Sequence, residues 1–252
     1  MSGIIETNKT DNTNKTDKNK TDKTDKEKEK EKTCKIYKMY RIKFEKTGVA
    51  KYISHLDLNR LFSRSLARAG IDVMHSEGFN PRPKISFVSA LSLGVESLCE
   101  FVEIKISDIN NIDDINDIND MNDIDILEKI KRVFPQGVNI TDVYEPVNDF
   151  KNIDRTRYHI YMTSDDFCAG DLKQLFANDV IVEKKPGVNI NLKDYICDLT
   201  VSEGLADVVL KSNQEMFLNP ENIIKGINLK YMIEDYSIKK IEVYDKNNEV
   251  FR

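Results

Sequence analysis

Residues 39–69 read MYRIKFEKTGVAKYISHLDLNRLFSRSLARA, and this stretch decides the fold because a strand signal is followed at once by a helix signal. Over Met39–Glu45 apolar and polar residues alternate, which is typical of a half-buried β-strand. A helix is predicted over Ser54–Ala69: it begins with a preferred N-cap residue, and Asp57 three positions later completes a capping box. Gly70 is placed to end that helix. The sequence therefore predicts a strand that leads into a capped helix.

The same signals continue along the chain and give the order β-α-β-β-α-β with one extra short strand, after which a similar order starts again. The elements expected after residue 69 are Asp72–His75, Ile85–Leu91, Cys99–Ile106, Ile126–Phe134, Val138–Glu145, Arg157–Met162, Asp171–Ala177, Val180–Lys184, Asn191–Val201, Ala206–Lys211, a helix opened by Asn219-Pro220, and Ile238–Tyr244. We predict an α+β protein of two tandem ferredoxin-like (βαββαβ) units, residues 39–147 and 155–252, joined near residues 148–154.

Two segments have a biased composition. Residues 1–38 hold repeats of Asn/Thr-Lys-Thr-Asp and then alternate Lys and Glu, so they have almost nothing apolar to bury and are expected to form a disordered tail. Residues 108–125 cycle Asp-Ile-Asn, and their isoleucines drift around a helix without forming a stripe, which predicts a disordered insert. The insert lacks the glycine turn and terminal glutamate of a calcium-binding loop.

The composition bounds the class of protein. Charged residues make up 32% and hydrophobic residues 40% of the 252 residues, which suits a soluble globular protein. No apolar run approaches the roughly 20 residues that a membrane helix requires, and residues 1–10 are polar, so we expect a cytoplasmic protein that does not contact a membrane. The net charge is −5, yet residues 39–106 carry ten Lys and Arg against seven Asp and Glu. This basic segment allows an anionic partner.

The potential metal ligands are widely spaced. The four cysteines stand at 34, 99, 168 and 197, so no pair has the spacing of a zinc or iron-sulfur site. The chain has only three histidines, at 55, 75 and 159. We therefore predict neither a metal site nor a cofactor.

Three arginines lie along one face of the first predicted helix. Arg60, Arg64 and Arg68 are four residues apart and share a helix face. Two interpretations remain open: a solvated charged face, or a surface of three guanidinium groups that binds phosphate.

His55, Asp57 and His75 are the candidates for catalysis. Asp57 could orient His55 for proton transfer, and His75 follows a short strand that could bring the two imidazoles together. The competing interpretation is that both histidines are ordinary surface residues.

The stretch Gly78-Phe79-Asn80-Pro81-Arg82-Pro83-Lys84 is polar and stiff. The two prolines fix their own φ and push Asn80 and Arg82 toward extended geometry, so Arg82 and Lys84 are presented on a preordered loop. Such a loop either binds a ligand or is only a rigid turn.

Several motifs together resemble a known family. They are MYRIKFEKTG (39–48), YISHLD (52–57), RAG (68–70), SEGFNP (76–81), PKISF (83–87), LGVES (93–97) and, more loosely, RTRY (155–158) and NLKDYI (191–196). The chain resembles the radical-SAM-associated protein family, a domain of unknown function found beside or fused to B12-binding radical-SAM proteins. The resemblance implies a family site at Ser54, His55, Asp57, Arg68, Gly78, Phe79, Asn80, Pro81 and Lys84, without implying its chemistry.

Three functions follow as hypotheses. The first is a non-catalytic accessory protein that helps a radical-SAM partner recognise its substrate. The arginine row and the Arg82–Lys84 loop suit an anionic substrate, and the analogy to tandem ferredoxin-like RNA binders suggests RNA; no DNA partner is predicted. The second is a metal-independent ribonuclease or other hydrolase that uses His55 and His75. The third is a structural partner of the radical-SAM protein.

Overall fold

The computed structural model describes residues 37–107, 122–163, 169–202 and 204–252. The expected tail (1–38) and insert (108–125) therefore lie almost wholly outside the described residues. At their edges, Tyr37 already belongs to a strand, and Asp123 begins a helix. The helix starts three residues before the predicted Ile126 because the side chain of Asn122 caps it by accepting from the backbone N–H of Asp125.

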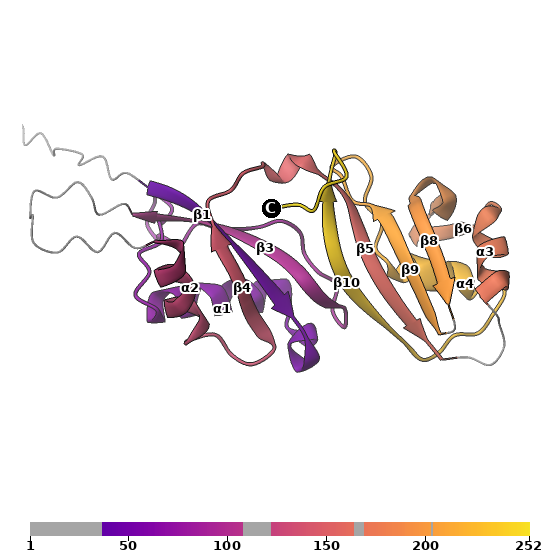
Figure 1. The fold of residues 1–252 in the computed structure, drawn as a ribbon, viewed down its shortest axis with the longest axis horizontal. Coiled ribbons are helices and arrows are strands. Elements are labelled where there is room, and N and C mark those ends of the chain that lie inside the picture. Colours follow the sequence, from indigo (N-terminus) through magenta and orange to yellow (C-terminus); the bar gives the residue numbers. More distant parts are fainter. Residues whose placement is uncertain (1–36, 108–121, 164–168, 203) are drawn as a thin grey trace, which may run out of the picture. The chain divides into compact units, whose positions relative to one another are not determined.

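The first half follows the predicted order of elements (Figure 1). Its strands and helices are β1 (Tyr37–Lys46), α1 (His55–Arg68), β2 (Ile85–Phe87), β3 (Glu96–Ser107), α2 (Asp123–Lys131) and β4 (Val138–Tyr144), with a short 3-10 helix, η1, at Gly48–Tyr52. The strand expected at Asp72–His75 is reduced to two isolated bridges, at Val73 and His75. The sequence could not show this reduction because it depends on the partners of the two residues, Ile106 of β3 for Val73 and Pro83 for His75.

The second half repeats the order with an added hairpin. Its elements are η2 (Phe150–Asn152), β5 (Ile153–Met162), α3 (Ala169–Ala177), β6 (Ile181–Lys185), β7 (Val188–Asn191), η3 (Leu192–Asp194), β8 (Ile196–Ser202), β9 (Leu205–Lys211), α4 (Glu221–Ile227) and β10 (Tyr236–Asp245). The single strand predicted over Asn191–Val201 is wrong. The Asn191 side chain accepts from the backbone N–H of Lys193 and turns the chain into η3, which separates β7 from β8.

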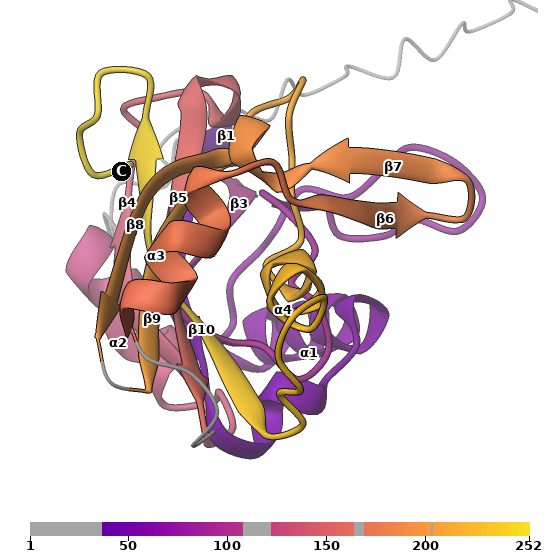
Figure 2. The same ribbon diagram turned by 90° about the vertical axis from the view of Figure 1, so that its right-hand side faces the viewer.

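One sheet of eight strands joins both halves. Its order is β4-β1-β3-β10-β5-β9-β8, and β2 pairs with β3 beside this path. Within each half all neighbouring strands are antiparallel, and the orders β4-β1-β3-β2 and β10-β5-β9-β8 place corresponding strands in corresponding positions. The halves meet where β3 and β10 pair in parallel at Glu96 and Ser97. The β6–β7 hairpin forms a separate sheet and stands away from the main one (Figure 2). The protein thus has a mixed α and β fold.

Each half has its own apolar core. In the first half Leu58, Phe62 and Leu66 of α1 are buried, as the helical period predicts, and Phe62 packs against Phe44 of β1 with ring centroids 4.9 Å apart. In the second half Leu172 and Ile223, from α3 and α4, pack into a separate cluster. Among the described helices, none combines the length and apolar character needed to cross a membrane.

Gly137 holds the turn into β4 at a close approach. Its φ is +90°, and a Cβ there would lie 2.8 Å from the carbonyl oxygen of Thr47 and 2.9 Å from the Cβ of Ala50. We expect Gly137→Ala to lower the free energy of unfolding by about 2–4 kcal/mol, since backbone strain and a steric clash combine. Urea unfolding followed by circular dichroism measures this loss. Gly70→Ala is the control, because Gly70 has φ +73° with no atom within 4 Å; equal losses in both variants would contradict the role of the close approach.

Candidate functional site

The start of α1 is closed by its own side chains. Ser54 Oγ accepts from the backbone N–H of Asp57 at 3.1 Å and donates to Asp57 Oδ2 at 2.8 Å, and Arg60 donates to Asp57 Oδ1 at 3.0 Å. The hydrogen bond from Ser54, followed by that from Arg60, lowers the pKa of the exposed Asp57 carboxyl. Asp57 therefore stays ionised near neutral pH and stabilises the helix start.

The three predicted arginines line one open hollow, which we call the arginine hollow. Its volume is about 530 Å³. Its lining residues are Asp57, Arg60, Leu61, Arg64, Ser65 and Arg68 of α1 with Val133 and Pro135, which follow α2. The row is thus a concave surface between two elements and not a convex helix face.

The arginine hollow is electropositive. Arg60 is paired with Asp57, whereas within the described part of the chain neither Arg64 nor Arg68 has an ion pair or a side-chain hydrogen bond. A step of four residues along a helix separates the Cα atoms of successive arginines by about 6 Å along the axis. The two unpaired guanidinium groups can therefore each bind a separate phosphate or carboxylate group.

The histidines occupy separate places. His55 packs edge-on against Phe87 at the end of β2, with ring centroids 5.3 Å apart. His75 forms a backbone bridge with Pro83. In the residues that the structure describes, no hydrogen bond, ion pair or ring contact joins either imidazole to the other or to Asp57. The structure therefore offers no contact that would support the acid–base pair.

Residues 75–84 form a loop between the bridge at Val73 and the start of β2 at Ile85. The loop closes on itself, because Lys84 N donates to Met74 O at 2.8 Å and Ser76 N donates to Arg82 O at 2.8 Å. Arg82 N also donates to Ser76 Oγ at 3.0 Å. The predicted preordering is consistent with these bonds. Gly78 has φ +132°.

The tip of this loop is strongly exposed. Phe79 is 99% exposed, and Asn80, Pro81, Arg82 and Lys84 are also exposed. An aromatic ring beside two cations gives the loop both a stacking surface and positive charge. No buried contact explains why a phenylalanine stands there.

The helix start and the loop lie at opposite ends of β2. Phe87, at the far end of this strand, contacts His55, while the loop closes just before Ile85. No described contact connects Ser54–Asp57 with Gly78–Lys84, so the single family site that the resemblance implies for these residues stays a prediction. Arg68, at the other end of α1, is closer along the chain to the segment that leads into the loop.

A comparison with protein families identifies the chain's relatives. The model of a family described as "Uncharacterized protein conserved in bacteria (DUF2344)" matches residues 39–220. The chain belongs to this family. The match contains both the arginine hollow and the loop at 75–84, and it ends before α4 and β10. No curated protein matches the chain. The family description states no activity, so the link to radical-SAM proteins stays a proposal.

Sequence reasoning missed a buried arginine, Arg41 in β1. Its guanidinium lies against the rings of both Phe150 and Phe251, at 4.5 and 4.6 Å from their centroids. It pairs with Glu103 and donates to the carbonyl oxygen of Arg252 at 2.8 Å. The alternation of β1 places Arg41 on the face expected to meet solvent, and only the distant residues that cover it make it buried.

A second missed group is the buried ion pair of Lys240 and Glu100. Lys240 Nζ lies 3.0 Å from Glu100 Oε1, and the two residues are 4% and 3% exposed. Burial is the largest single influence and lowers the pKa of the ammonium, but the attraction of Glu100, its hydrogen bond and the nearby Tyr158 and Cys99 together outweigh it, so the pKa of Lys240 is raised. The pair forms only because β10 joins β3, a pairing that no local pattern signals.

The described cysteines show no reactive character. Cys99 is buried, and burial raises the pKa of its thiol to about 12. Cys197 is exposed, and partial burial also raises the pKa of its thiol. Within the described ranges no group of three or more His, Cys, Asp or Glu side chains is arranged to hold a metal ion.

Proposed function

We propose that this protein is a non-catalytic, cytoplasmic accessory protein that helps a radical-SAM enzyme recognise RNA. The observation that carries the RNA clause is the arginine hollow, in which Arg64 and Arg68 are unpaired among the described residues. Guanidinium groups bind phosphate oxygens with paired N–H donors. A concave surface with two such groups can hold successive phosphates of one strand.

The exposed loop supports the same proposal. RNA is recognised mainly where its bases are unstacked and can lie against aromatic side chains. Phe79 offers such a ring, with Arg82 and Lys84 beside it to meet the backbone. The loop would supply base contacts and the hollow would supply phosphate contacts, so that one surface reads the bases and the other positions the strand.

The strand order adds support by analogy. The orders β4-β1-β3-β2 and β10-β5-β9-β8, in which the last strand of each half lies beside the first, are what a ferredoxin-like unit would have and support this analogy. We propose that the described chain is a tandem of two such units. Several RNA-binding modules use four-stranded sheets of this type, although the fold alone assigns no function.

The partner is proposed from the sequence resemblance. A radical-SAM enzyme holds its cluster with three closely spaced cysteines, whereas the cysteines here stand at 34, 99, 168 and 197. The proposal therefore assigns the radical chemistry to the partner. The hydrolase alternative is not favoured, because no described contact brings His55 and His75 together.

Charge reversal in the arginine hollow tests the RNA clause. We expect Arg64→Glu with Arg68→Glu to weaken binding of a transfer-RNA pool at least tenfold near 100 mM salt, because two phosphate contacts become repulsive. The slope of log affinity against log salt should fall by about 1.5. Electrophoretic shift or fluorescence anisotropy at several salt concentrations measures both. Phe79→Ala should weaken binding to unpaired bases about five- to a hundredfold with little change in the salt slope.

The matched control keeps the charge change and moves it to the other half. Lys173→Glu with Lys193→Glu reverses two exposed lysines near α3 and η3 and should retain affinity within about twofold. Absence of RNA binding by the unaltered protein at low salt would refute the RNA clause. Co-purification with a radical-SAM protein whose substrate affinity does not depend on this chain would instead favour a purely structural partner.

A further inference from the structure

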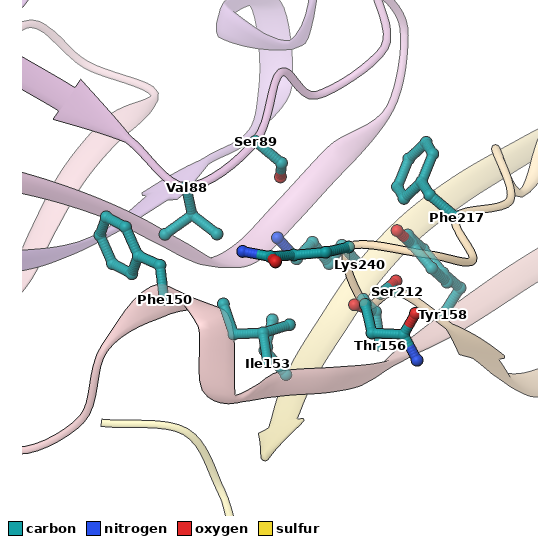
Figure 3. Close-up of a pocket in the computed structure, with 12 residues that line it drawn as sticks. Val88, Ser89, Phe150, Ile153, Thr156, Tyr158, Ser212, Phe217 and Lys240 are labelled. Carbon is teal, nitrogen blue, oxygen red and sulfur yellow. The ribbon is translucent and has the colours of Figure 1, made fainter. Parts of the chain in front are cut away.

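A second cavity lies where β10 and the chain after β2 separate along the same edge of β3. β10 pairs with β3 only at Glu96 and Ser97, and β2 pairs with it from Val102 to Ile104. Between these ladders Val88 N donates to Phe101 O at 3.2 Å. Because β10 and the chain after β2 diverge from each other along β3, they leave a cavity, which we call the junction pocket (Figure 3).

The junction pocket has a volume of about 260 Å³. At about 30 Å³ per water molecule, this is room for a ligand on the order of ten non-hydrogen atoms. Its lining residues are Val88, Ser89, Phe150, Ile153, Thr156, Tyr158, Ser212, Asn213, Gln214, Phe217, Lys240 and Val243. Figure 3 shows Val88, Phe150 and Ile153 on one side of the pocket and Thr156, Tyr158 and Ser212 on the other. Such a pocket suits a molecule with one apolar and one polar part.

Lys240 brings a buried positive charge with unused donors to this pocket. An ammonium group has three N–H donors, and among the described residues Lys240 uses one of them, in the bond to Glu100 at 3.0 Å. At 4% exposure the others cannot be satisfied by bulk water. Its raised pKa keeps this group protonated, so it acts as a cation and donor and not as a nucleophile.

The surroundings of Lys240 hold more positive than negative charge. Lys46 of β1 and Lys240 of β10 lie opposite the same residue of β3, Ser97, so two ammonium groups flank one strand. Lys46 is 1% exposed and donates to Ile53 O at 2.8 Å. Burial lowers its pKa, and Glu100 opposes that effect. Within the described ranges, Glu100 is thus the buried carboxylate that faces both buried lysines, and an anion in the pocket would balance the second positive charge.

A buried hydroxyl gives an independent sign that the pocket takes a ligand. Ser212 Oγ is buried and has no hydrogen-bond partner among the described residues. It lines the same cavity as Lys240. Burying an unsatisfied hydroxyl costs free energy, so such a group calls for a partner.

We propose that the junction pocket binds a small organic anion whose carboxylate or phosphate accepts from Lys240 and Ser212 and whose apolar part lies against Phe150 and Ile153. This site is independent of the arginine hollow. It draws side chains from both halves, since Val88 precedes β3 and Ser212 follows β9.

The test uses the full chain and four probes of one shape. Benzoate and phenyl phosphate combine a ring with an anion, benzyl alcohol is neutral, and benzylamine is cationic. We expect at least one of the two anions to raise the melting temperature by several degrees and to bind measurably by calorimetry, with benzyl alcohol and benzylamine at least tenfold weaker. Which anion binds more tightly distinguishes a carboxylate from a phosphate ligand.

Two conservative variants locate the binding site. Ser212→Ala should weaken anion affinity about three- to tenfold without loss of stability, because it removes an unsatisfied hydroxyl. Tyr144→Phe removes another buried and unpartnered hydroxyl that does not line the pocket, and should leave the affinity unchanged. The proposal is overturned if neither anion binds, if the neutral probe binds as well as the anions, or if both variants behave alike.

Discussion

Arg41→Met is expected to lower the free energy of unfolding by about 3–4 kcal/mol. The variant leaves the carboxylate of Glu103 and the carbonyl oxygens of Asn148 and Arg252 without their shared donor in a largely buried place. The methionine can still pack against Phe150 and Phe251, so apolar contact is retained and the loss of stability reports on the polar contacts. The chain has no tryptophan, so urea unfolding is best followed by circular dichroism.

Lys38→Met provides a control on the same strand. Lys38 pairs with Glu145, and both side chains are exposed to solvent. An exposed pair contributes little, so we expect a change within about 0.5 kcal/mol. Asn148 and Phe150, which contact Arg41, belong to the connection between β4 and β5. Similar losses of stability in the two variants would show that the contacts of Arg41 do not hold this connection against the sheet.

Glu100→Gln is expected to cost about 3–5 kcal/mol at pH 7. It removes the buried carboxylate that faces both Lys240 and Lys46, while the shape of the side chain is kept. Lys240→Met should cost less, about 1–3 kcal/mol, because Glu100 and Lys46 remain as one negative and one positive charge. An order of losses opposite to this one would show that Lys46 does not share the carboxylate.

The pH dependence of the Glu100→Gln variant gives a second measurement. In the protein itself the folded-state pKa of Lys240 is raised, so this group stabilises the fold below the unfolded-state pKa and its contribution is lost only as the pH rises through the folded-state value. In the variant, burial without the carboxylate should lower that pKa below the unfolded value. The difference in the free energy of unfolding between the variant and the unaltered protein should therefore become smaller as the pH is raised from 7 toward about 10. Urea unfolding at several pH values tests this.

Local patterns predicted most elements of the first half. The alternation of β1 and the cap at Ser54 depend on neighbouring residues only, so strand and helix were placed to within two residues. The second half was less predictable, because the turn at Asn191 interrupts a run of residues that looks like one strand. The pairing of β3 with β10 has no local signal, since its partners are separated by more than 140 residues.

The candidate site was predictable only in part. Spacing put Arg60, Arg64 and Arg68 on one face, but the hollow also needs Val133 and Pro135, which come from another element. The buried charges at Arg41 and Lys240 were missed because the sequence pattern pointed to the wrong environment for them. A charged residue in an alternating strand normally faces water, and here distant residues cover it.

The loop at residues 75–84 has a consequence for the strand that it interrupts. Before the loop, Val73 lies opposite Ile106 and Met74 N donates to Lys105 O. After the loop, Ile85 lies opposite Ile104, which is the next residue of β3. The antiparallel pairing with β3 therefore continues across the loop without skipping a residue of β3. Residues 75–84 are therefore an insertion that does not shift the register of the pairing with β3. A change in the length of this loop would leave every residue of β3 with the same partner.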